Sequence, residues 1–250
     1  MARVTPSSCH LASGSIGVIV LWNGSTRGAT VLRVCEPELM DEAQQAKAYA
    51  EADFSATDQA VIDRIDSLFP AGLGERIVDL GCGPGNISFR LAARYPVSEV
   101  LGLDGAPAML AIAKARLLGE AGWPNLRFKL AVLPCPDWPA KAFSAVVSNS
   151  LLHHLHDPMV LWRTVRQLGA PGAVVYLKDL RRPGSEAAVQ ALLAAHLPGA
   201  PPLLQRDYIQ SLRAAFSPEE VIGQLQEAEL VGLQVSAVED RYLEVAGRLG

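Results

Sequence analysis

Short runs of consecutive apolar residues alternate along the middle of the chain with stretches in which apolar residues recur every three or four positions. The runs are typical of buried parallel strands, and the wider spacing is typical of helices packed on a sheet. The predicted strands lie near Ile77, near Val100, over 126–130, over 145–147 and over 174–177, and the predicted helices begin at Asn86, Pro107 and Asp157. This alternation predicts a parallel sheet covered on both faces, with a ligand site at the carboxyl ends of its strands.

Helical patterns also lie before and after this core. Residues 38–54 are rich in Ala, Gln, Glu and Met, which predicts one helix, and Ser55 or Thr57 is expected to cap a second helix. The apolar face of that second helix comprises Val61, Ile62, Ile65, Leu68 and Phe69. The segment 183–217 interrupts the alternation with two more helices, one capped by Ser185 and one with Tyr208, Ile209, Leu212 and Phe216 on one face.

The last part of the chain has the pattern of a helix followed by a hairpin. Ser217-Pro218-Glu219-Glu220 has the form of a capping box with proline at the first helical position. After that helix, apolar and polar residues alternate over 233–237 and again from Tyr242 to Val245, around a polar turn. The whole chain is therefore predicted to be an α/β protein with a doubly wound, mostly parallel, seven-stranded sheet, an antiparallel C-terminal hairpin and a helical insertion.

These patterns divide the chain into a tail and one domain. Residues 1–30 surround one apolar run, 16–22, with Ser, Gly and Thr, and seven residues are too few to span a bilayer. A poorly ordered extension is favoured over a signal peptide, and translation starting near Val31 is a further alternative. A single domain is expected over 31–250. Its parts are lid helices over 38–70, a core over 71–182, an insertion over 183–217 and the last helix and hairpin over 218–250.

Composition narrows the possible partners. Half of the residues are hydrophobic, the formal net charge is −4, and no basic block of the kind that binds a phosphate backbone is present. Neither nucleic acid nor a membrane is therefore an expected partner. The four cysteines lie far apart with no CxxC pair, which indicates neither a disulfide framework nor a cysteine zinc site and suits a reducing cytoplasm. No pattern in the sequence indicates an oligomeric state.

Three glycines follow the first predicted strand, in the segment Asp79-Leu80-Gly81-Cys82-Gly83-Pro84-Gly85-Asn86. Glycine adopts backbone angles that a tight turn demands, and it lets a ligand approach main chain that carries no side chain. The helix that begins behind the glycines offers unpaired N–H groups to an anionic group. The segment therefore indicates a site for a small-molecule cofactor.

The spacing of the glycines distinguishes between cofactors. A dinucleotide fingerprint needs a glycine at its sixth position, where this chain has Asn86. The pattern resembles motif I of the class I S-adenosylmethionine-dependent methyltransferases, and Asp104, at the end of the second strand, matches their ribose-binding acid. Segments 149–158 and 170–173 are similar to the family's fourth-strand exit and its turn into strand five. The resemblance covers about 46–245 and implies a Rossmann-like fold.

The resemblance implies which residues contact the cofactor S-adenosyl-L-methionine. They are Asp79, Gly81, Cys82, Gly83, Gly85, Asn86, Asp104, Gly105, Ala131, Val132, Asn149 and Ser150. Asp79 is expected either to anchor the loop or to lie near the cofactor's amino group. Asp104 has the alternative of a helix N-cap, but the upstream glycine loop favours the ribose role.

Two positions depart from the family pattern. The family often places an acidic residue after strand three, against the adenine amino group, whereas the segment 128–134 lacks one. Strand four commonly begins Phe-Asp, and this chain has Phe143-Ser144. Adenine is then expected either to be held by Ala131, Val132 and main chain or to be bound less tightly.

Three histidines, His153, His154 and His156, follow the fourth strand. Histidine titrates near neutral pH, so His153 or His154 is the candidate general base for a hydroxyl or amine nucleophile, and packing under the pocket is the alternative. No metal is expected, because adjacent histidines are predicted to point in divergent directions and a metal needs a convergent set of ligands.

The acceptor is predicted to be a small molecule that lies between the N-terminal helix and the insertion. Tyr49, Phe54, Asp179 and Tyr208 are the candidate contacts, with Arg181, Arg182 and Asp207 as further polar possibilities. The Asn-Pro-Pro-Tyr set that grips an amide or exocyclic amine is missing from 149–152, which favours an oxygen or carbon acceptor. The predicted function is therefore methyl transfer to a small molecule. A cofactor-binding protein without catalysis and an NAD-dependent oxidoreductase are the alternatives.

Overall fold

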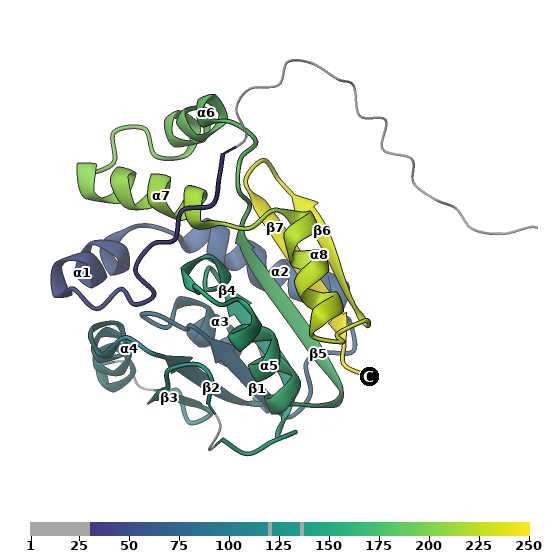
Figure 1. Cartoon of the computed structure of the whole chain (residues 1–250). Helices are drawn as coiled ribbons and strands as arrows, with labels where there is room; N and C mark the ends of the chain where they lie inside the picture. Colours follow the sequence, from purple (N-terminus) through teal and green to yellow (C-terminus); the bar gives the residue numbers. More distant parts are fainter. Residues whose placement is uncertain (1–30, 120–121, 136–137) are drawn as a thin grey trace, which may run out of the picture.

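The computed structural model describes residues 31–119, 122–135 and 138–250, so the expected tail lies outside the described residues. Seven strands form one sheet in the order β3-β2-β1-β4-β5-β7-β6 (Figure 1). The strands are β1 Arg76–Leu80, β2 Glu99–Asp104, β3 Leu126–Leu130, β4 Phe143–Asn149, β5 Gly169–Leu180, β6 Leu233–Val238 and β7 Tyr242–Arg248. The first five are parallel, and β7 pairs antiparallel with both β5 and β6. The predicted fold class, hairpin included, is confirmed.

The strand order reverses between β1 and β4, which are direct neighbours. Ile77 of β1 lies opposite Val100 of β2 on one side and opposite Ala145 of β4 on the other. The chain leaves β1 and β2 toward one edge of the sheet and β4 and β5 toward the other. Such a reversal opens a crevice at the carboxyl ends of the strands. Leu80, Asp104 and Asn149, the last residues of β1, β2 and β4, therefore stand around one crevice.

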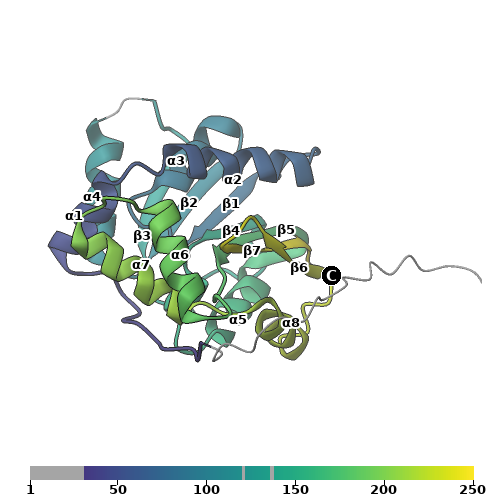
Figure 2. The same cartoon turned by 90° about the horizontal axis from the view of Figure 1, so that it is seen from above.

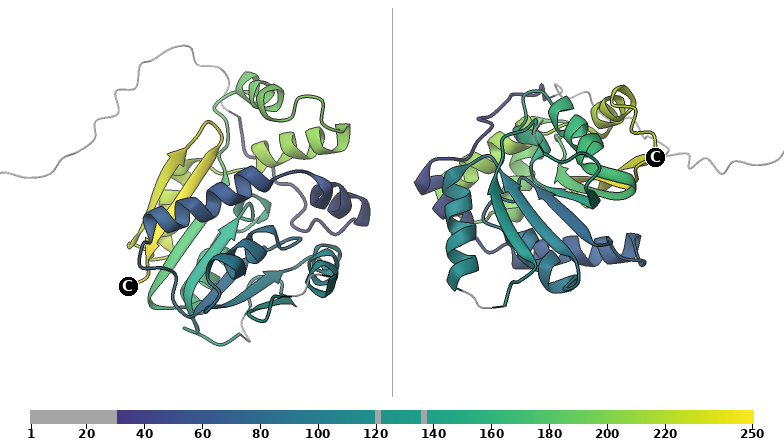
Figure 3. Two further views of the ribbon diagram at one scale, coloured as in Figure 1. Left: turned by 180° about the vertical axis from the view of Figure 1, so that it is seen from behind. Right: turned by 90° about the horizontal axis from the view of Figure 1, so that it is seen from below.

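Helices cover both faces of the sheet (Figure 2). The helices α2 Ser55–Leu68, α3 Asn86–Arg94 and α4 Pro107–Gly119 contribute apolar side chains to one core layer, which includes Ile65, Phe89 and Leu110. The helices α5 Met159–Leu168 and α8 Pro218–Glu227 pack on the other face around the fully buried Trp162. Seen from behind, α2 lies across the strands (Figure 3). Both faces are closed, so the exposed strand ends are the place for a ligand.

The helices of the lid and insertion differ in part from the sequence pattern. The single helix predicted over 38–54 is α1 Ala43–Glu51, and the residues before it are extended. The prediction that Ser55 or Thr57 caps α2 was wrong, because Phe54 is the N-cap residue and Ser55 N donates to the Asp53 side chain. The insertion contains α6 Glu186–His196 and α7 Pro202–Ala214, so Phe216 lies beyond α7. The caps at Ser185 and Ser217 are confirmed.

Residues 31–42, which we call the strap, run along α7 and a short 3-10 helix, η1 Leu152–His154, before α1 begins. The guanidinium group of Arg33 donates from Nε to the Ala214 carbonyl at 2.6 Å and from Nη2 to the Leu155 carbonyl at 2.8 Å. The same group lies 3.9 Å from the ring centre of Phe216. The strap thus joins the insertion to the end of the sheet. None of the helices in the described part of the chain has the length and apolarity that crossing a membrane requires.

Candidate functional site

A cavity of about 430 Å³ lies at the carboxyl ends of the strands. Its walls include residues from the glycine loop, from the ends of β2 and β4, from α1 and α2, and from η1 and α7. Eleven predicted cofactor residues line it: Asp79, Gly81, Cys82, Gly83, Asn86, Asp104, Gly105, Ala131, Val132, Asn149 and Ser150. Gly85, the twelfth predicted cofactor residue, is not among the residues that line the cavity.

The three loop glycines have different surroundings. All three have positive φ, +68° at Gly81, +53° at Gly83 and +88° at Gly85. A Cβ at Gly81 would meet Leu151 at 2.8 Å and one at Gly85 would meet Phe128 at 2.7 Å, so both positions exclude a side chain by packing. At Gly83 no atom lies within 4 Å of that position. Gly83 therefore offers bare main chain toward the cavity, as a close-fitting ligand requires.

Asp104 fixes the glycine loop and also faces the cavity. One carboxylate oxygen accepts from Gly83 N at 2.7 Å and the other accepts from Ala106 N at 2.7 Å. Burial raises the pKa of Asp104, and the backbone hydrogen bonds oppose that rise. A carboxylate oxygen can accept two hydrogen bonds, so each of these oxygens keeps a lone pair. Both the cap and the ligand roles are therefore compatible in one carboxylate.

Asp79 lies deeper, at the end of β1. Its carboxylate accepts from the Ser88 hydroxyl of α3 at 2.6 Å, and only 1% of the residue is exposed. Burial raises the pKa of Asp79 to about 7, although the Ser88 bond lowers it. The residue thus anchors the loop to α3 and also lines the cavity.

The residues that follow β3 and β4 form another wall of the cavity. Ala131 N donates to the Asp104 carbonyl, and Ala131, Val132 and Leu133 line the cavity without a carboxyl group. Ser150 has φ of +58°, and its N–H donates to the Lys178 carbonyl of β5. This wall is mostly apolar and main chain.

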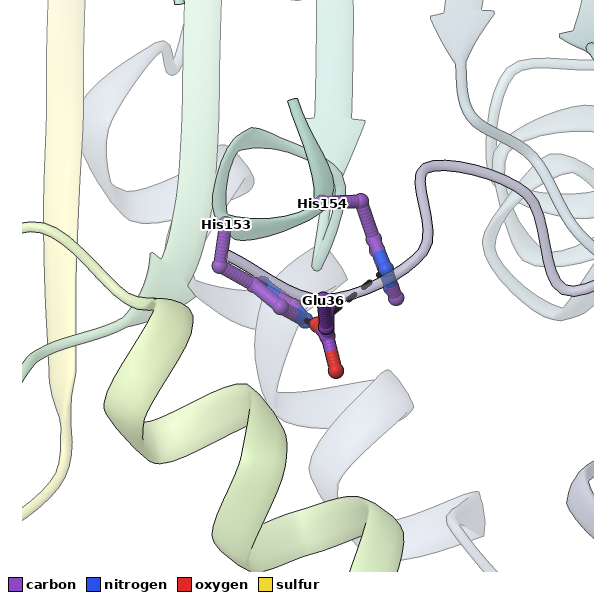
Figure 4. Close-up of side chains that lie close together, drawn as sticks. All are labelled: Glu36, His153 and His154. Atoms are coloured by element: carbon purple, nitrogen blue, oxygen red, sulfur yellow. Dashed lines mark ion pairs between the residues drawn. The ribbon is translucent and has the colours of Figure 1, made fainter. Parts of the chain in front are cut away.

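The two candidate basic histidines lie at the other end of the cavity and converge. Their ring centres are 4.2 Å apart, and both rings face the Glu36 carboxylate of the strap (Figure 4). Glu36 Oε1 lies 3.5 Å from His153 Nε2 and 3.2 Å from His154 Nδ1. The expectation that adjacent histidines diverge was therefore wrong, because the turn of η1 brings both rings to the same side.

The two histidines differ electrostatically. His153 Nδ1 lies 2.5 Å from Asp179 Oδ1, and both side chains are buried. Burial lowers the pKa of His153, but the Asp179 carboxylate outweighs it and the pKa is raised overall. Burial and the neighbouring His153 both lower the pKa of His154, so its ring is neutral. Burial also raises the pKa of Glu36.

The predicted acceptor contacts divide into two groups. Tyr49, Phe54 and Tyr208 line the cavity, and the rings of Tyr49 and Phe54 have centres 5.0 Å apart. The Tyr208 hydroxyl is buried and has no hydrogen-bond partner among the described residues. Asp207 also lines the cavity and accepts from Gln45 Nε2.

The other predicted contacts lie elsewhere. Asp179 is not among the cavity-lining residues, and its carboxylate is bound by Leu152 N, His153 and Leu180 N. Arg181 and Arg182 bond to the Asp240 carbonyl and to Glu220, away from the cavity.

The cavity and cluster residues that the sequence analysis missed include Glu36, Asp58, Lys178 and Tyr242. Lys178 directly follows the strand predicted over 174–177, and this position could have singled it out. Its ammonium is 3.1 Å from Glu239 and 4.1 Å from the ring centre of Tyr242. Asp58 has a buried carboxylate oxygen without a hydrogen-bond partner in the described part of the chain. Glu36 lies in an extended segment without periodicity, so no local pattern pointed to it.

The chain is similar in sequence to known methyltransferases. A family model described as a methyltransferase domain matches residues 78–175, from β1 to the middle of β5. The trans-aconitate 2-methyltransferase of Methylobacterium nodulans is 36% identical over 170 residues, which cover 66% of this chain and 58% of that protein. The enzyme of the same name from Methylobacterium radiotolerans is 43% identical over 99 residues, covering 39% and 35%. The chain thus spans between about a third and three fifths of the length of these relatives.

Solved structures share the fold at low sequence identity. A SAM-dependent methyltransferase from Aquifex aeolicus has a TM-score of 0.59 at 16% identity, covering 84% of this chain and 99% of that chain. The plantazolicin methyltransferase BpumL, solved in complex with SAH, has a TM-score of 0.65 at 11% identity, covering 83% and 91%. At such low sequence identity, the similarity shows only that the fold is shared, namely the sheet and its flanking helices.

Proposed function

Because this chain belongs to the class I S-adenosylmethionine-dependent methyltransferases, we propose that it binds S-adenosylmethionine in this cavity and transfers the methyl group to an oxygen or carbon of a small-molecule acceptor. The observation that supports the proposal most directly is the pairing of Gly83 with Asp104. The bare main chain at Gly83 faces the cavity, and the Asp104 carboxylate binds that same residue from the neighbouring strand.

In this proposal the glycine loop and Asp79 hold the methionine end of the cofactor. Asp104 accepts hydrogen bonds from the ribose, and Ala131 and Val132 contact the adenine. When bound, the cofactor supplies a methyl group that is already activated on sulfur. The protein then has to align the acceptor with that methyl group and to exclude water. The remaining walls, from α1, η1 and α7, are the place for the acceptor.

The charge of the cavity restricts the acceptor. Six carboxyl groups line the cavity, those of Glu38, Asp58, Asp79, Asp104, Asp157 and Asp207. Lys178 is the one lysine or arginine on the same described walls, and Glu239 already pairs with it. Like charges repel strongly where water is excluded. We therefore propose an uncharged or cationic acceptor and do not extend the tricarboxylate named for the relatives to this chain.

The aromatic side chains restrict the acceptor further. Four aromatic side chains, those of Tyr49, Phe54, Tyr208 and Tyr242, line the cavity. Aromatic faces bind apolar or cationic groups well. The acceptor is therefore proposed to have an apolar or aromatic body, with a hydroxyl or enol group directed at His153 and His154, where its proton would be taken up.

Transfer of label from methyl-labelled S-adenosylmethionine tests this proposal. A panel of neutral phenols, cationic aromatic amines and trans-aconitate is incubated with the chain, and labelled product is separated from the cofactor. We expect methylation of neutral or cationic compounds and none of trans-aconitate. Methylation of trans-aconitate above all others would contradict the charge argument.

Two simpler alternatives are separated by ligand binding. An NAD-dependent oxidoreductase would show a rise in unfolding temperature with NAD and none with S-adenosylhomocysteine. A cofactor-binding protein without catalysis would bind S-adenosylhomocysteine and methylate nothing. The apolar exit of β3 supports weak adenine binding, and this is the observation that favours the second alternative. A cytoplasmic location remains part of the proposal, supported by the free thiols of Cys35, Cys82 and Cys135.

A further inference from the structure

Three side chains that can bind a metal ion converge at one end of the cavity. This end, which we call the acceptor end, is formed by the strap, η1 and α7. The three side chains are Glu36 of the strap and His153 and His154 of η1, and one donor atom from each lies within 4.8 Å of the other two (Figure 4). Glu36 and His153 are more than a hundred positions apart in the sequence. The fold, rather than a local sequence motif, brings them together.

The spacing of the donor atoms fits an ion between them. Imidazole nitrogen and carboxylate oxygen lie about 2.1 Å from zinc, so two donors at tetrahedral or octahedral angles are about 3.0–3.5 Å apart. Glu36 Oε1 lies 3.5 Å from His153 Nε2 and 3.2 Å from His154 Nδ1. Both of these separations fall within that range, and the two histidine nitrogens lie within 4.8 Å of each other.

The surroundings orient both histidines for coordination. The Asp179 carboxylate binds His153 Nδ1, and it is itself fixed by Leu152 N and Leu180 N. A carboxylate on the far nitrogen of a ligating histidine is the usual arrangement at metal centres, because it leaves the other nitrogen free to bind the ion. His154 Nδ1 is buried and makes no hydrogen bond to any described residue. Its close neighbour is Glu36 Oε1 at 3.2 Å, and an ion held between these two atoms would satisfy both.

The fourth side of the cluster is open. His153 and His154 line the cavity, whereas Glu36 is held from behind by the Ser211 hydroxyl, 3.2 Å from each carboxylate oxygen. Three protein ligands with one open position are typical of catalytic rather than structural metal sites. We propose that Glu36, His153 and His154 bind one divalent transition-metal ion, with Asp179 orienting His153.

The donor set indicates the class of ion. Two imidazoles and one carboxylate suit zinc, ferrous and manganous ions, whereas calcium and magnesium take mainly oxygen ligands. The binding of the ion does not depend on the proposed function. Its use does: in the methyltransferase proposed above, the bound ion would replace His153 and His154 as the group that promotes proton loss, because it would attract the acceptor oxygen while the proton passes to water.

Zinc titration tests the site directly. The untagged full-length chain is treated with a chelator, dialysed and titrated with zinc chloride in a calorimeter. We expect one zinc ion per chain, and at least a tenfold loss of affinity in Glu36→Gln and in His154→Gln. His196→Gln is the matched control, since His196 pairs with Asp240 outside the cavity, and it should titrate like wild type. X-ray absorption of the zinc-loaded wild type should show nitrogen and oxygen ligands without sulfur.

The outcomes separate this inference from the proposed function. If wild type takes up no zinc, or if Glu36→Gln and His154→Gln both titrate like wild type, the cluster is a buried ion-pair group and the inference is overturned. Should the variants fail to fold, sulfur ligands in the wild-type absorption spectrum would overturn it, and a spectrum of nitrogen and oxygen alone would support it. Binding of S-adenosylhomocysteine to the zinc-free chain is measured in parallel, because its loss would count against the proposed function alone.

Discussion

The two ends of the cavity are built in different ways. One end, where the cofactor is proposed to bind and which we call the cofactor end, comprises the ends of adjacent strands and the loops that leave them, and main-chain hydrogen bonds such as Gly81 N to the Leu103 carbonyl hold it. The acceptor end comprises the strap, η1 and α7, which come from three distant parts of the chain and are joined by Arg33, Glu36 and Asp179. The first end is part of the sheet, whereas the second depends on a few charged side chains. Each end should therefore respond separately to substitution.

The largest expected effect is a dependence of the free energy of unfolding on pH. It arises from Asp79, at the cofactor end. Its folded pKa of about 7 lies above the unfolded value, so the folded chain binds more protons between pH 4 and 7. The free energy of unfolding of the ligand-free chain should fall as pH rises through that window, by up to about 4 kcal/mol from this group. Urea unfolding at several pH values measures it. Asp79→Asn should flatten the slope, and an equal slope in that variant would contradict the assignment.

Next in size is the loss of cofactor affinity in Asp104→Ala. The substitution removes the acceptor of two backbone N–H groups and the proposed ribose contact. We expect roughly a hundredfold weaker binding of S-adenosylhomocysteine, about 2.7 kcal/mol, by calorimetry. Asp157→Ala is the control, since Asp157 also lines the cavity but is mostly exposed and lies outside the glycine loop and the end of β2. Similar losses in both variants would mean that the two ends are not separate.

At the acceptor end, Arg33→Ala should destabilise the chain without affecting the cofactor. The variant loses the bonds to the Ala214 and Leu155 carbonyls and the stacking on Phe216, which together should cost about 2 kcal/mol in urea unfolding. Arg181→Ala, which loses a single exposed bond, should cost less than about 0.5 kcal/mol. Binding of S-adenosylhomocysteine should stay within twofold of wild type. A loss as large as that of Asp104→Ala would refute the separation.

The smallest expected effect is a loss of cofactor affinity in Gly83→Ala, which tests whether Gly83 contacts the cofactor. Gly83→Ala places a methyl group in open space that the cofactor is proposed to fill, so affinity should fall about tenfold, or 1.4 kcal/mol. Gly172→Ala is a matched control, because Gly172 also has positive φ and open surroundings but lies at the far end of β5. Both variants should lose similar stability, and only Gly83→Ala should bind more weakly. Equal binding in the two variants would remove Gly83 from the site.

The sequence predicted the fold and the strand-end positions because both depend on local rules. Apolar runs near Ile77 and Val100 can only be buried strands in this context, and the acidic residue after the second run falls at a strand end whatever the loops do. The capping box at Ser217 is likewise a four-residue signal, and the structure contains it. The spacing of the three loop glycines did not distinguish Gly85, which packs against Phe128, from Gly83, whose surroundings are open.

The acceptor end could not be predicted in the same way. Glu36 lies in an extended segment, and its meeting with His153 depends on how α7 and η1 pack, which no local pattern encodes. Strong helix formers at 38–42 suggested a longer helix, but the strap is held extended by backbone and side-chain bonds such as that from Val34 N to the Arg213 carbonyl. Tertiary contacts outweighed propensity there, and the same contacts direct both histidines to one point.

The strap also determines when each end of the cavity can form during synthesis. Arg33 and Ala214, which it joins, are 181 positions apart in the sequence, whereas β1, β2 and β4 of the cofactor end are complete once Asn149 has been made. The strap leaves the ribosome early but has no surface to bind until α7 exists. On a growing chain, the acceptor end is therefore assembled last, around a cofactor end whose strands were synthesised before it.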